Sequence, residues 1–151
     1  MRAAVTEASR INRLLLVAVA ALSLAGIAIS AVSLQRHYAK SATDFCDFND
    51  KFSCDIVNRS EYSTVGGIPV AAIGVAGYSA LFLLSTIWKS QQQTPNRLLG
   101  AALAGLAFAL YLTYVEAYKL MTWCILCLIS LALISLVSLF AIVIKWRSAR
   151  A

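Results

Sequence analysis

The chain has 151 residues, of which 60% are hydrophobic and only 13% are charged. So few charged side chains are atypical of a soluble domain of this length and indicate a membrane protein. The formal net charge is +6, but the basic residues flank apolar stretches instead of forming one cluster. The charge therefore indicates membrane topology, and we expect no binding of nucleic acid.

Four apolar stretches follow one another along the chain, each about the 20 residues that a helix needs to cross a bilayer core. The predicted spanning helices cover residues 14–34, 68–88, 98–118 and 124–144. A polar outer loop over 36–64 joins the first two spans. The chain lacks the alternation of polar and apolar residues that would indicate a β-barrel. We predict an all-α integral membrane four-helix bundle that forms a single domain over 1–151.

The first apolar stretch could also belong to a secretory signal peptide, because it follows a basic start and ends near the small-residue pattern Ala31-Val32-Ser33. Its apolar run is about 21 residues, longer than the roughly 7–15 residues of a signal core. We therefore expect an uncleaved first helix; cleavage would leave three spans.

Basic residues are divided unequally between the two sets of helix ends. One set has eight basic residues and one acid, whereas the other has five basic residues and six acids. The basic-rich set comprises Arg2, Arg10, Arg13, Lys89, Arg97, Lys145, Arg147 and Arg150, with the acid Glu7. Lysine and arginine beside short loops stay in the cytoplasm. We therefore predict a multi-pass protein of the inner (plasma) membrane with both termini cytoplasmic.

All four cysteines fall on the predicted extracytoplasmic side, where disulfides persist. Cys46 and Cys54 lie in the outer loop, and Cys124 and Cys127 begin the fourth span. Cysteines three apart share one face of a helix, and a helix N-terminus favours a thiolate. Thr122 is the predicted N-cap, which places Cys124 near the second helical position.

This placement suggests an electron relay through thiol–disulfide exchange. Cys46 and Cys54 would take electrons from a soluble dithiol, and Cys54 would exchange with Cys124. Cys127 lies one turn deeper and would pass electrons to a quinone. The alternative is a structural or transport membrane bundle with static disulfides.

Other interpretations of the cysteines are buried packing as small hydrophobes and a four-cysteine zinc site. The seven-residue gap between Cys46 and Cys54 is unlike common zinc spacings, so we expect no metal. Glu116 is interpreted as an interfacial acid that pairs with Lys119, although acids within spans are functional candidates. His37 is interpreted as a solvated residue at the interface.

With these motifs in place, the chain resembles bacterial homologues of vitamin K epoxide reductase. The matching residues are Cys46, Cys54, Ser60, Gly67-Ile68-Pro69, Gly74, Tyr78, Tyr111-Leu112-Thr113-Tyr114, Glu116 and Trp123-Cys124-Ile125-Leu126-Cys127. The similar bacterial enzymes that reoxidise a periplasmic thiol oxidase have their CxxC before the spaced pair, and the order here is the reverse.

The resemblance implies a four-helix bundle around a quinone, such as ubiquinone or menaquinone, with Cys127 facing it and Cys124 as partner. Ser60 matches a position beside the quinone, and Trp123 is assigned to the same site. The loop cysteines would shuttle electrons from an extracytoplasmic thioredoxin-fold oxidase. Many bacterial members carry such a domain fused; this chain stops after the fourth span, so we expect the partner in trans.

One departure from the family pattern concerns the reaction. The vertebrate enzymes place a tyrosine four residues after the second CxxC cysteine, and this chain has Leu131 there. The resemblance therefore favours quinone reduction coupled to disulfide formation over epoxide reduction.

Overall fold

The computed structural model describes residues 2–39, 46–87 and 93–150. The helices are α1 (Arg2–Tyr38), α2 (Cys54–Arg59), α3 (Val70–Thr86), α4 (Thr94–Val115) and α5 (Ile125–Arg150), with the 3-10 turn η1 (Glu61–Ser63) and the π-helical turn η2 (Glu116–Leu120). Antiparallel hairpins pair β1 (Asp47–Asn49) with β2 (Phe52–Ser53), and β3 (Thr64–Val65) with β4 (Ile68–Pro69). These strands are only two or three residues long and fall in the segment that connects α1 to α3, whereas helices form the rest of the architecture. The predicted all-α class is confirmed.

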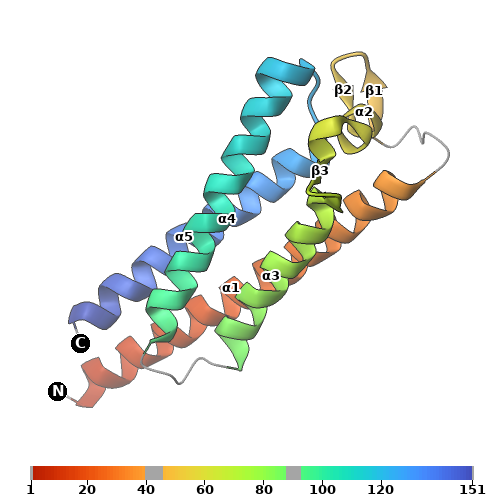
Figure 1. Ribbon diagram of the computed structural model, residues 1–151. Helices are drawn as coiled ribbons and strands as arrows, with labels where there is room; N and C mark the ends of the chain where they lie inside the picture. The colour runs from red at the N-terminus through yellow and green to blue at the C-terminus, as the bar shows by residue number, and fades with distance from the viewer. Residues whose placement is uncertain (1, 40–45, 88–92, 151) are drawn as a thin grey trace.

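The long helices pack side by side as a bundle. Helix α1 packs against α3 and α5, and α4 packs against the same two helices. Both termini lie at one end of the bundle, whereas β1, β2 and α2 lie at the other end (Figure 1). The segments that contain the cysteines are therefore remote from the chain termini.

Within the described residues, three helices are long and apolar enough to cross a membrane: Thr6–Tyr38, Thr94–Leu120 and Ile125–Arg150. They overlap the predicted spans 14–34, 98–118 and 124–144 and extend beyond them. Helix α3 is also apolar but has only 17 residues. The predicted end of this span at residue 88, Lys89, and residues 40–45 of the predicted loop lie outside the described residues.

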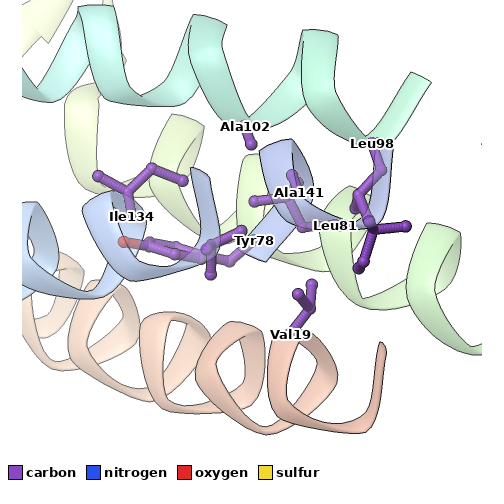
Figure 2. Close-up of a cluster of buried hydrophobic side chains, with 9 residues drawn as sticks. Val19, Tyr78, Leu81, Leu98, Ala102, Ile134 and Ala141 are labelled. Atoms are coloured by element: carbon purple, nitrogen blue, oxygen red, sulfur yellow. The ribbon is translucent and has the colours of Figure 1, made fainter. Parts of the chain in front are cut away.

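The bundle core contains buried side chains from α1, α3, α4 and α5. They are Val19, Tyr78, Leu81, Leu98, Ala102, Ile134, Val137, Ala141 and Ile144, most of which are labelled in Figure 2. The Tyr78 ring lies against Gly26, where an added Cβ would come within 2.3 Å of it. The Tyr78 hydroxyl donates to the Ser130 carbonyl at 2.9 Å. Tyr78 thus joins α3 to α1 and to α5.

The start of α5 differs from the sequence prediction. The N–H of Leu128 donates to the Cys124 carbonyl at 3.0 Å, so the helical hydrogen bonds begin from Cys124. The Thr122 hydroxyl donates back to the Leu120 carbonyl instead of capping α5, and the predicted N-cap at Thr122 is wrong. The reason is the turn before it, where Met121 adopts a left-handed backbone conformation with φ 51°. Cys124 therefore lies just before the first turn of α5.

Candidate active site

A short parallel β-bridge joins the outer segment to the chain entering α5. The Trp123 N–H donates to the Lys51 carbonyl at 2.8 Å, and the Ser53 N–H donates to the Trp123 carbonyl at 3.2 Å. Each bridged segment is followed directly by a cysteine, Cys54 on one side and Cys124 on the other. The backbone itself therefore brings one cysteine of each pair together.

The structure gathers all four cysteines in one cluster at this end of the bundle. Cys46, Cys54 and Cys124 are buried together, and Cys127 packs against them. Cys46 and Cys54 form a disulfide with their Cα atoms 5.5 Å apart. Cys124 and Cys127 are free thiols. The cluster thus contains one oxidised and one reduced pair, a composition suited to exchange between them.

The two thiols differ in their surroundings. A hydrogen bond with the Cys127 thiol lowers the pKa of Cys124, which lies before the first turn of α5, although burial of Cys124 opposes this effect. Cys127 lies within α5 and faces a cavity between the helices. Cys124 is therefore placed for exchange with the loop pair, and Cys127 for contact with a molecule in the cavity.

The cavity has a volume of about 370 Å³, within the size range of small-molecule sites. Its walls come mainly from α1, α3, α4 and α5, with further residues from α2, η1, β4 and η2, and are mainly apolar. Representative lining residues are Ile29, Gly74, Phe108, Leu112, Leu126 and Ile134. Gly74 lies close to α1, since an added Cβ would come within 2.7 Å of Ser30 Oγ. The cavity suits an apolar molecule that arrives from the lipid.

Polar side chains line the outer part of the cavity. Asn58 of α2 is only 7% exposed, and its Oδ1 accepts a hydrogen bond from Ser33 Oγ at 2.7 Å. Among the described residues, its Nδ2 has no hydrogen-bond partner. Asn58 therefore offers a buried, unused N–H donor in the wall of an otherwise apolar cavity.

The residues assigned to the quinone from the sequence occupy different places. Ser60 lines the cavity and donates its hydroxyl hydrogen to the Val57 carbonyl at 2.8 Å. Trp123 is half-buried and is not one of the described residues that line the cavity. Its backbone forms the bridge that aligns the two cysteine pairs. A direct role of either side chain in quinone binding stays a prediction.

Glu116 differs from its sequence interpretation as an interfacial acid. It is 2% exposed, and its Oε2 accepts a hydrogen bond from the Cys124 N–H at 3.0 Å. Among the described residues, no ion pair joins it to Lys119. The turn η2 and the left-handed Met121 fold the chain back, so that the start of α5 lies over Glu116.

His37 is also not a solvated interfacial residue. It is half-buried, lines the cavity and donates Nδ1–H to the Asn58 carbonyl. The long extension of α1 to Tyr38 carries this imidazole up to the short helix α2. The sequence did contain one clue to the positions of Glu116 and His37. Both are ionisable residues at the outer ends of predicted spans, where a side chain can reach a site between the helices.

Disulfide and dithiol pairs in contact at the end of an apolar helical bundle define the class of protein, a membrane thiol–disulfide oxidoreductase. Residues 17–144 match the vitamin K epoxide reductase family, and the chain belongs to this family. A search of curated proteins finds no match to the chain. Members of the family use quinones, and the predicted family resemblance is confirmed.

Proposed function

We propose that the protein passes electrons from an extracytoplasmic thioredoxin-fold oxidase to a membrane quinone and so supports disulfide formation. The observation that carries this proposal is the position of the sulfur cluster. One pair lies in the outer segment at the end of the bundle, and the other includes Cys127 in the cavity wall. A single cluster thus offers one pair to a soluble protein and one thiol to a lipid-soluble molecule.

The exchange between the pairs begins with reduction of the Cys46–Cys54 disulfide by the partner's dithiol. The Cys54 thiolate then attacks Cys124 in a Cys124–Cys127 disulfide, and Cys127 leaves as a thiolate. Attack of Cys46 on Cys54 releases Cys124 and restores the loop disulfide. The products are a Cys46–Cys54 disulfide and two thiols at Cys124 and Cys127, which is the state in the structure.

The second half-reaction oxidises the two thiols. Formation of the Cys124–Cys127 disulfide releases two electrons and two protons, and a quinone that receives them leaves as the hydroquinone. The cavity fits such a substrate, because its walls are largely apolar and its polar groups are few. The unpartnered Nδ2 of Asn58 is a suitable donor for a quinone carbonyl. The chain's contribution is to hold the ring beside Cys127 and to exclude water.

We place four spans in the membrane, with α3 as the shorter one, both termini in the cytoplasm and the cysteines outside. The unequal division of basic residues supports this orientation. The location of both termini at the end opposite the cysteine cluster supports it as well (Figure 1). A static structural bundle is the alternative, but two free thiols packed against a disulfide favour exchange.

The proposal is tested by the stoichiometry of a reconstituted reaction. Purified protein in lipid nanodiscs, given a reduced thioredoxin-fold protein and a short-chain ubiquinone, should oxidise one dithiol for each quinone reduced. The ratio follows because each disulfide formed releases two electrons. Replacing the dithiol protein by its oxidised form is the control. A protein that keeps a fixed set of disulfides and reduces no quinone would contradict the proposal.

Substitution of Asn58 tests the proposed quinone donor. Asn58→Leu removes the free N–H and keeps a side chain of similar size, so KM for the quinone should rise about 2- to 10-fold, the equivalent of one hydrogen bond of roughly 0.5–1.5 kcal/mol. KM for the dithiol protein should not change. Ser33→Ala is the matched control, because it removes only the donor to Oδ1. An unchanged quinone KM in Asn58→Leu would show that Nδ2 does not bind the substrate.

A further inference from the structure

Glu116 is a buried acid for which the steps above give no role. Its Oε2 is held by the Cys124 N–H, and its Oε1 has no partner of hydrogen-bonding geometry within the described residues. Glu116 also lines the cavity that Cys127 faces. Ionisable side chains buried in membrane bundles are costly and commonly belong to proton pathways.

The carboxyl group shares a cavity with the reacting sulfur. Glu116 and Cys127 line the same cavity, and Glu116 Oε2 accepts a hydrogen bond from the N–H of Cys124, the other thiol of the pair. One carboxyl oxygen is thus fixed by the backbone at the start of α5, while the other is unpartnered among the described residues and belongs to the same cavity wall as the thiol. This arrangement holds a carboxyl group in the same cavity as the thiol that must lose a proton before it can donate electrons.

We propose that Glu116 is the proton-transfer residue of the Cys124–Cys127 pair, and this inference rests on the proposed function. The Glu116 carboxylate takes the proton from the Cys127 thiol and gives it to one oxygen of the quinone. A second transfer moves the Cys124 proton to the other oxygen. Formation of the Cys124–Cys127 disulfide supplies the two electrons. Glu116 ends as the carboxylate that it was at the start, so protons and electrons balance.

The other titratable groups that line the cavity are His37 on α1, Tyr62 in η1, Tyr78 on α3 and the reacting Cys127 on α5, and Cys124 packs in one cluster with Cys127. His37 donates to the Asn58 carbonyl, and the Tyr78 hydroxyl donates to the Ser130 carbonyl. Among the described residues that line the cavity, Glu116 is the one carboxyl group, which distinguishes it as the proton acceptor.

Glu116→Gln tests the role, because glutamine retains an oxygen for the Cys124 N–H but cannot carry the proton. We expect kcat for quinone reduction to fall about 10²- to 10⁴-fold, with KM unchanged and one ionisation missing from the pH profile of kcat. Glu7→Gln, a change at an exposed acid in α1 near the chain terminus, should have no effect. If the unsubstituted protein reduces quinone and Glu116→Gln keeps its kcat and pH profile, only the role of Glu116 is wrong. If the unsubstituted protein reduces no quinone, the proposed function fails instead.

A second measurement needs no quinone. In a Cys124→Ser background the rate at which N-ethylmaleimide alkylates Cys127 should depend on two coupled ionisations, those of Cys127 and Glu116. Adding Glu116→Gln should leave one ionisation, and Glu116→Asp should restore the second. Adding His37→Gln should leave both in place. A profile that Glu116→Gln does not alter would overturn the proposal.

Discussion

Cys127→Ala is expected to abolish quinone reduction, with a loss of at least about 10³-fold of the kind that follows removal of a covalent nucleophile. The thiol lines the cavity, and the substitution leaves the cavity walls otherwise intact. Without it, Cys124 cannot form the disulfide that releases two electrons. The measurement is the loss of quinone absorbance with a reduced thioredoxin-fold protein as electron donor.

Cys46→Ala is the matched control because it removes a sulfur from the same cluster but from the other pair. It should stop turnover with the protein partner and retain quinone reduction when a small dithiol reduces the Cys124–Cys127 pair directly. The two variants thus separate the two half-reactions. Full turnover in both would show that the relay does not exist.

Composition predicted much of the fold, because a membrane imposes length and apolarity on each helix. The spans 14–34, 98–118 and 124–144 lie almost entirely within long apolar helices. The helices themselves extend well beyond the apolar segments, as α1 does to Tyr38. Hydropathy detects the part in the membrane core, whereas the backbone hydrogen bonds of a helix continue through polar residues.

The sequence also predicted that the two cysteine pairs lie on the same side of the membrane, because charge and cysteine placement both indicate that side. It did not predict the backbone bridge that aligns the two pairs. The bridge between Phe52 and Trp123 pairs backbone atoms of segments 71 positions apart, and backbone pairing leaves no signature in side-chain pattern.

Glu116 and Asn58 show a second limit of sequence reasoning. Glu116 lies three residues before Lys119, and this local spacing favoured a surface pair. The left-handed backbone at Met121 instead folds Cys124 over the carboxyl. Asn58 lies in a polar loop sequence, yet the short helix α2 turns it onto the cavity and Ser33 occupies only one side of its amide. Long-range contacts decided both cases.

A direct disulfide between Cys54 and Cys124 is the second result with a large expected effect. In the Cys46→Ala and Cys127→Ala double variant, these two are the remaining cysteines, and both are buried in the same cluster. They should form a disulfide almost completely under mild oxidation, which a mass spectrum of the joined peptides would identify. The bridge at Ser53 and Trp123 holds the preceding residues together, so little chain motion is needed.

The comparison is the Cys54→Ala and Cys127→Ala double variant, which leaves Cys46 and Cys124. Cys46 precedes β1 and is not aligned with the start of α5 by the backbone bridge, so its link to Cys124 should form much more slowly.

With the thioredoxin-fold partner present, the roles of the loop cysteines should reverse. Cys46 should then be the loop cysteine that exchanges with the partner, because the backbone bridge aligns Cys54 and not Cys46 with Cys124. Equal rates of linkage to Cys124 from Cys46 and Cys54 would mean that the bridge does not select the exchanging sulfur, and the electron path would need a different order.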